Sequence, residues 1–282
     1  MIDAGQTKAL MPTRETLVRS FMGGALLSLA AAFAVTMTVQ TGSALIGAML
    51  FPVGFCMLYL LGYDLLTAAF VLGPMAWIDR RPGVNVRTVL RNWGLVFCGN
   101  FAGAAVVALL MAIVVTNGFA TDPDAVGRVI GEIGEGRTVG YAEFGAAGML
   151  TLFVRAVLCN WMVSTGVAGA FVSKDVIGKV IAMWMPIMLF FAMEFEHSIV
   201  NMFLFPAGLL LGGDFTVMDY LVWNEIPTVI GNLIGGLTFT GLMLYLAHRR
   251  STRRRDPAAG PTPGSATSGG EHATRHAGTA HS

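Results

Sequence analysis

The residues best suited to chemistry lie in the middle of a long apolar run. Residues 194–202 read EFEHSIVNM and contribute two carboxylates, an imidazole and an amide from Glu194, Glu196, His197 and Asn201. Polar groups at such a depth are costly unless they face protein or a water-filled path. The pattern predicts a polar site inside the protein, with His197 as the group that can exchange a proton near neutral pH.

The composition is typical of a multi-pass membrane protein. Hydrophobic residues make up 55% of the 282 residues and charged residues 12%, with a mean hydropathy of +0.66, whereas a soluble domain carries about 25% charged residues. Lipid is therefore an expected partner, and nucleic acid is not. The GEG sequence at 134–136 lacks the third glycine of a dinucleotide-binding motif, so no cofactor is expected. The cysteines show no metal-ligand spacing, so no metal site is expected: Cys56, Cys98 and Cys159.

Six apolar spans are expected, at residues 21–41, 45–78, 92–116, 145–172, 177–211 and 223–247. About 20 residues cross a bilayer as a helix, so the second and fifth spans are too long for one simple helix. The second is interrupted around Gly62 and Asp64, and the fifth in the polar stretch around Ser198. We expect two broken helices in an all-helical membrane domain.

Three segments divide the chain in this interpretation: an N-terminal segment at 1–20, a transmembrane domain at 21–248 and a tail at 249–282. The tail is rich in Gly, Pro, Ser and Thr and is expected to be disordered. Lysine and arginine concentrate on the side of both termini; the exceptions are Arg128, Arg137 and Arg155. The bias predicts cytoplasmic termini in a cell (inner or plasma) membrane.

The third and sixth spans repeat one pattern. Asn92, Gly99, Asn100 and Gly103 recur at the same spacing as Asn224, Gly231, Asn232 and Gly235. Because each half holds three spans, the halves must run in opposite directions, which predicts an inverted repeat. Such folds bring broken helices together at the midplane of the membrane.

Helix N-termini at the two breaks could attract a small anion through their free N–H groups. Thr67 would then face His197. A desolvated imidazole favours its neutral form, and an arriving anion favours the protonated one. His197 could then lend a proton to a weak-acid anion; the alternative is a histidine that only satisfies helix hydrogen bonds.

The FEHSIVNM sequence, followed by FLFP at 203–206, resembles the signature of the formate/nitrite transporter family. GYDLLT at 62–67, LCNW at 158–161 and GNLIG at 231–235 support the resemblance. It implies an aquaporin-like protomer of six helices, assembled as a homopentamer that transports formate, nitrite, hydrosulfide or short carboxylates. It implies a central pair of His197 and Thr67, with Asn201 as a pore asparagine. It also implies apolar constrictions at Phe51, Phe55, Leu65 and Phe190.

The chain departs from the family pattern in its charges. Glu194 stands where the family usually has a small residue, commonly glycine, and no lysine occurs near Phe144, where the family often has a vestibule lysine. Arg155 is expected either to compensate in the vestibule or to extend to the membrane interface. Small-residue faces such as Gly99 with Gly103 are expected to allow close contact between helices during assembly.

Three functions are compatible with these residues. The first is a channel or proton-coupled carrier for small weak-acid anions. The alternative is a pore of the same fold for a neutral or cationic solute such as ammonium, favoured by the added carboxylates. The third is a membrane enzyme with Glu196 and His197 as acid and base. The sequence holds neither a second catalytic cluster nor a cofactor motif, so we expect that the protein is not an enzyme.

Overall fold

The computed structural model describes residues 1–248, and the predicted disordered tail at 249–282 lies outside the described residues. The described part consists of helices and contains no strand. Within it, four continuous helical stretches are long and apolar enough to cross a membrane. They are α2 (Thr13–Thr41), α6 (Val86–Val115), α9 (Gly145–Val172) and the run Val217–His248.

The run Val217–His248 changes its helical winding along its length. It comprises α12 (Val217–Tyr220), η1 (Leu221–Glu225), α13 (Ile226–Ile234), η2 (Gly235–Leu242) and α14 (Met243–His248), in which η1 and η2 are π-helical. π-Helical turns often accompany functional sites in helices.

Shorter apolar helices form two groups separated by non-helical residues. The first group is α3 (Ala44–Leu50), α4 (Pro52–Leu60) and α5 (Leu66–Ile78); the second is α10 (Val176–Ala192) and α11 (Ser198–Leu210). Residues 61–65 form a first gap, between α4 and α5, and residues 193–197 form a second gap, between α10 and α11. Gly62 and Asp64 lie in the first gap. Ser198, by contrast, is the first residue of α11, so only part of the polar stretch is non-helical.

The polar segments contain helices that hydropathy did not predict. These are α1 (Ile2–Leu10), α7 (Ala125–Gly136) and α8 (Val139–Ala142), and α2 begins at Thr13, so the predicted boundary at residue 20 falls inside α2. An asparagine capping box starts α6 at Val86 rather than at residue 92. These polar first turns continue the helices beyond the apolar runs from which spans are recognised. Only α9 has the predicted bounds.

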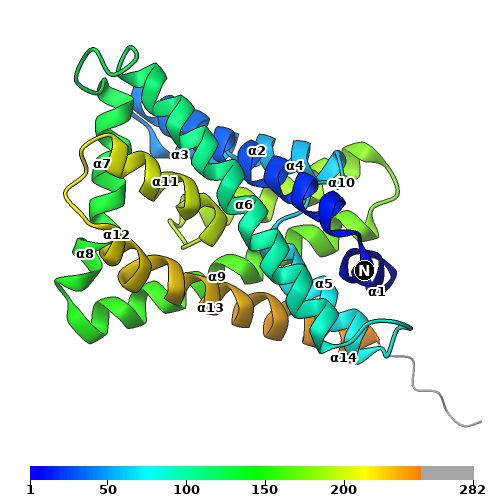
Figure 1. Cartoon of the computed structure of the whole chain (residues 1–282). Helices are drawn as coiled ribbons and strands as arrows, with labels where there is room; N and C mark the ends of the chain where they lie inside the picture. Colours follow the sequence, from blue (N-terminus) through cyan, green and yellow to red (C-terminus); the bar gives the residue numbers. More distant parts are fainter. Residues whose placement is uncertain (249–282) are drawn as a thin grey trace, which may run out of the picture. The chain divides into compact units, whose positions relative to one another are not determined.

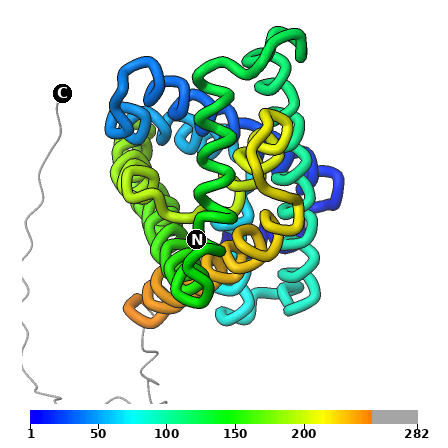
Figure 2. Tube along the Cα trace, turned by 90° about the vertical axis from the view of Figure 1, so that its left-hand side faces the viewer, coloured from blue at the N-terminus to red at the C-terminus, as the bar shows by residue number. Residues whose placement is uncertain are grey.

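The helices pack in two similar arrangements. α2 lies against α6, and α9 lies against α13 (Figure 1). α1 packs on α5, and α7 packs on α11. In Figure 2, α7 is the green helix on the side that faces the viewer. The glycines expected to serve assembly are used inside the chain instead: a Cβ on Gly103 would strike the Phe21 carbonyl, and one on Gly99 would strike Ser20.

One asparagine fastens the first gap to a long helix. The Asn100 Nδ2 group, on α6, donates to the carbonyls of Ser20 (2.7 Å) and Asp64 (2.8 Å). Its Oδ1 accepts from the N–H of Leu66 (3.0 Å). The side chain thereby satisfies a backbone donor at the start of α5, which an interrupted helix leaves unpaired.

A second asparagine fastens the other gap in the same way. The Asn232 Nδ2 group, on α13, donates to the carbonyls of Ala156 (2.8 Å) and Glu196 (2.9 Å). Its Oδ1 accepts from the N–H of Ser198 (3.0 Å) at the start of α11. The repeated sequence pattern therefore corresponds to a repeated set of hydrogen bonds.

Candidate functional site

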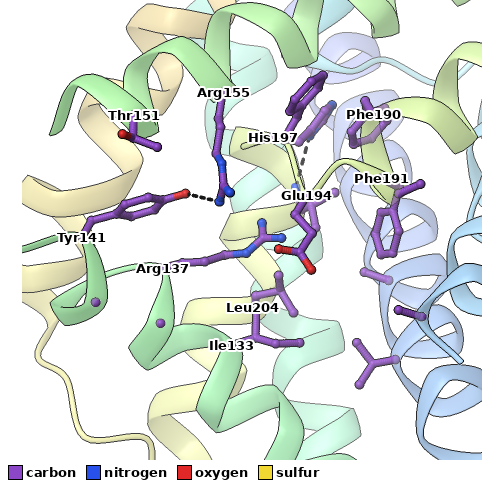
Figure 3. A pocket seen from close by; sticks show the side chains of 18 of the residues that line it. Ile133, Arg137, Tyr141, Thr151, Arg155, Phe190, Phe191, Glu194, His197 and Leu204 are labelled. Atoms are coloured by element: carbon purple, nitrogen blue, oxygen red, sulfur yellow. Dashed lines mark hydrogen bonds between the residues drawn. The ribbon is translucent and has the colours of Figure 1, made fainter. Parts of the chain in front are cut away.

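A cavity of about 780 Å³ lies between α2, α7, α9 and α10 and reaches the second gap. His197 and the two phenylalanines that precede the gap, Phe190 and Phe191, contribute to its wall. The charged residues on the wall are Arg137, Arg155 and Glu194 (Figure 3). The cavity thus joins an aromatic wall, a histidine and charges of both signs.

His197 caps α11 with its side chain and is 1% exposed. Its Nδ1 accepts the N–H of Val200 at 3.3 Å, so Nδ1 carries no proton in this arrangement. The proton of the neutral ring is then on Nε2, which lies 3.4 Å from the hydroxyl oxygen of Thr67. A second proton would have to bind at Nδ1 and would break the cap, because two donors would then face each other.

Thr67 lies in the first turn of α5, so the pair joins the beginnings of two helices. Asn160, on α9, donates from Nδ2 to the Thr67 carbonyl at 3.1 Å and to the Asn232 carbonyl at 2.7 Å. Asn160 thus links the first turn of α5 to α13, the helix that carries Asn232. The sequence marks Asn160 only as part of the LCNW motif, from which these contacts could not be predicted.

A cluster of aromatic rings lies against one side of the imidazole. The Phe190 ring stacks on His197 with centroids 5.5 Å apart, and Phe51 meets Phe190 edge-on at 5.7 Å. Phe191, which the sequence analysis did not select, stacks on Phe51 at 4.0 Å. The other residues predicted as constrictions, Phe55 and Leu65, are buried in the same core.

Glu196 and Asn201 are placed behind the cavity wall rather than on it. The buried Glu196 carboxylate accepts from Tyr141 Oη (2.9 Å), Arg137 Nη1 (3.4 Å) and Asn201 Nδ2 (2.9 Å). Asn224 adds a fourth donor at 3.2 Å. These bonds hold the residue next to His197 and leave the carboxylate facing protein.

Arg155 lies on the wall of the cavity. Its Nη1 donates to the Tyr141 hydroxyl at 2.9 Å, and its guanidinium lies 5.9 Å from the centre of that ring. Because Tyr141 also donates to Glu196, a chain of hydrogen bonds runs from the cavity wall to the residue beside His197.

Charged side chains also bond to the first gap, whose residues do not line the cavity. Asp64 pairs with Lys8, and the Gly62 carbonyl accepts from Lys8 Nζ and Arg19 Nη1, each at 3.3 Å. Asn92 donates to the Lys8 carbonyl at 3.0 Å. Of the residues predicted from this gap, only Thr67 reaches His197.

Several residues of the site could not be selected from the sequence. Arg137 and Tyr141 lie in the polar loop before the fourth span, Phe191 is one of many apolar residues of the fifth span, and Asn224 stands out only as part of the repeat. Glu225 is also buried; one carboxylate oxygen accepts from Tyr220 Oη at 2.9 Å and the other has no partner within residues 1–248. In the same residues, no group of three His, Cys, Asp or Glu side chains could hold a metal ion.

Comparison with known proteins decides the class. A family model described as formate/nitrite transporter matches residues 1–246. The chain belongs to the formate/nitrite transporter family. The family assignment predicted from residues 195–206 is thereby confirmed, and it makes the protein a membrane protein of the anion channel or transporter class.

Relatives in the formate/nitrite transporter family match most of the chain. A probable formate transporter from Methanothermobacter thermautotrophicus is 32% identical over 258 residues, 86% of this chain and 92% of that protein. A formate channel from Bacillus thuringiensis is 31% identical over 258 residues, 89% and 93% of the two chains. A solved pentameric formate channel with formate bound superposes with a TM-score of 0.68 at 22% identity, covering 84% and 98%, and shows the shared fold.

Proposed function

We propose that the protein conducts small monovalent weak-acid anions, such as formate, nitrite, hydrosulfide or short carboxylates, with proton exchange at His197. The observation that carries the proposal is the position of His197. It lines the cavity, caps the start of α11 and bonds to Thr67 from the other interrupted pair of helices. No chemical turnover of the transported acid is expected.

The aromatic cluster makes a proton necessary in this mechanism. A bare anion in a low-dielectric constriction loses several kcal/mol of solvation even after relaxation, and Phe51, Phe190 and Leu65 supply no charge that offsets the loss. An anion in the cavity favours the protonated imidazole. When the Val200 N–H releases Nδ1, that nitrogen takes a proton from water in the cavity, and the Nε2 proton passes to the anion. The neutral ring is then protonated on Nδ1, and it returns to its resting form when Nε2 takes a proton from water and Nδ1 releases its own. A neutral acid then crosses the constriction and dissociates on the far side.

Thr67 and Asn232 act as positioning residues in this mechanism. The Thr67 hydroxyl accepts a hydrogen bond from the Nε2–H group of the resting ring and holds the orientation of the ring. Asn232 fixes both chain neighbours of His197, through the Glu196 carbonyl and the Ser198 N–H. We include Arg155 as the cation that attracts anions into the cavity.

We further propose six membrane spans in an aquaporin-like inverted repeat. α4 with α5 would form one broken span, and α10 with α11 the other. Asn100 and Asn232 make equivalent sets of hydrogen bonds, which we call asparagine clamps. They support the repeat, because each asparagine accepts from a backbone N–H at the start of the helix after a gap. Both termini would then face the cytoplasm across a cell membrane.

Cysteine labelling tests this topology. With the native cysteines replaced, single cysteines at Thr121 and Ser251 should react with a membrane-impermeant reagent from opposite sides. Thr121 is exposed, so its labelling does not depend on opening of the structure. Labelling of both positions from one side would contradict the six-span arrangement.

We propose a homopentamer, with the pentameric formate channel of similar fold as support. Apolar side chains cover the outer faces of α6 and α10, including Leu109, Leu110, Ile181 and Met185. These faces are available for lipid and for neighbouring protomers. Native mass spectrometry in mild detergent should give the mass of five chains; a stable monomer or trimer would exclude this assembly.

Glu194 favours one alternative, a same-fold pore for a neutral or cationic solute such as ammonium. Its exposed carboxylate lies on the cavity wall and could attract cations. Reversal potentials in planar bilayers separate the two functions. Formate that crosses as a neutral acid carries no net charge, so the proposed function predicts formate flux accompanied by protons and no reversal potential under a formate gradient. A pore for a cation predicts instead a reversal potential under an ammonium gradient.

A further inference from the structure

Glu194 occupies a backbone conformation that suits glycine. Its φ is +53°, and its N–H donates to the Phe191 carbonyl at 3.0 Å. Gly62 has the same place in the other gap: φ is +75°, and its N–H donates to the Tyr59 carbonyl at 3.0 Å. Each residue lies two positions beyond the end of the preceding helix. Glycine adopts this conformation freely, whereas a residue with a Cβ is strained there.

No local bond of the side chain compensates this strain. Within residues 1–248 the Glu194 carboxylate makes neither a hydrogen bond nor an ion pair, and the residue is exposed on the cavity wall. Figure 3 shows the carboxylate directed toward the guanidinium of Arg137, with Arg155 on the same side of the cavity. A strained residue without local stabilisation points to a role in the cavity itself.

The two arginines retain unused donors. Arg137, at the end of α7, uses Nη1 for Glu196, and Arg155, on α9, uses Nη1 for Tyr141. Their other N–H groups have no partner among the residues that the structure describes. A guanidinium presents five donors in a planar fork that matches a carboxylate, and here two such groups line one cavity.

We infer that Arg137 and Arg155 form a binding site for a small carboxylate or similar oxyanion, and that Glu194 is a tethered carboxylate that competes for this site. The inference rests on the proposed function, since the ligand is the transported anion. Glu194 has the same functional group as a carboxylate substrate and is held close to the arginines by the chain. It therefore raises the anion concentration needed to fill the site without blocking the pathway beyond it.

The first test compares formate uptake by proteoliposomes that contain the wild type, Glu194→Gln or Glu194→Gly. Removing one charge near the site should lower the half-saturating formate concentration about three- to tenfold, with the maximal rate unchanged. Glu194→Gly should give the same shift and also raise the thermal unfolding temperature, because it removes the strain. The control Glu143→Gln, an exposed carboxylate outside the cavity lining, should leave the half-saturating concentration unchanged.

The second test asks whether Glu194 acts through the arginines. In an Arg155→Gln background, the effect of Glu194→Gln should shrink by at least half. An undiminished effect would mean that Glu194 acts only through its charge, and would overturn competition for the site. An increase in the half-saturating concentration for formate, or a loss of ammonium flux, would overturn the inference in favour of cation attraction.

Formate uptake by the wild type shows whether a negative result overturns the inference alone or the proposed function as well. Formate uptake by the wild type with no response to Glu194→Gln would overturn the competing site and leave the proposed function standing. No uptake of any anion by the wild type would overturn the proposed function, and the inference with it.

Discussion

Replacing His197 with asparagine is expected to remove the pH dependence of weak-acid transport. Asparagine is among the best helix-capping residues, so α11 should still begin at Ser198, but its amide cannot carry a proton to the anion. In the wild type, the protonated fraction of a titrating imidazole changes up to tenfold per pH unit. In the variant, formate uptake should either stop or become a leak whose rate does not follow pH between about 5 and 8.

His248 supplies the matched control for this change. It is the other histidine within residues 1–248 and lies exposed on α14. His248→Asn should keep the wild-type rate and pH profile. If His197→Asn also keeps both, the imidazole serves only as a helix cap and the proton-lending mechanism is wrong.

Removing either asparagine clamp is expected to destabilise the protein strongly. Asn232→Ala leaves two buried backbone groups at the second gap without their side-chain partner, the Ser198 N–H and the Glu196 carbonyl. It also removes the additional bond to the Ala156 carbonyl, which remains paired within α9. Each unsatisfied buried group costs about 1–3 kcal/mol, so we expect the free energy of unfolding to fall by roughly 2 kcal/mol or more. Thermal or denaturant unfolding in detergent measures the loss.

Asn100→Ala should give a loss of similar size, because Asn100 makes the equivalent bonds at the other gap. Gln40→Ala is the control, since Gln40 is an exposed amide on α2 whose side chain makes no hydrogen bond within residues 1–248. A small loss for either clamp, comparable to that of the control, would contradict the equivalence of the two halves. Asn232→Ala should also reduce formate uptake, because the clamp holds both neighbours of His197.

Much of the helical core could be predicted from apolar runs and their interruptions. The fourth predicted span coincides with α9, and Gly62 and Glu194 lie in the two gaps. The helices in the polar segments could not be predicted in this way. α7 buries one face, mainly against α11 and also against α2, so its sequence is half polar and does not stand out in a hydropathy profile.

The candidate site was predictable only in part. The pairing of Thr67 with His197 followed from two facing breaks and from the family resemblance. The orientation of Glu196 and Asn201 could not follow, because it depends on Tyr141, Arg137 and Asn224, which are distant in sequence and are brought together by packing. Spacing along one helix likewise could not assign Phe191 its stack on Phe51.

The uptake of a panel of small solutes by proteoliposomes tests the central claim most directly. Purified protein should accelerate the uptake of formate and nitrite over protein-free liposomes, with hydrosulfide, acetate and lactate defining the size limit. Uptake should rise as the external pH falls from about 8 to 5, because the transported acid carries a proton. Ammonium analogues should enter no faster than in protein-free liposomes. Accelerated uptake of ammonium analogues without uptake of any anion would contradict the account.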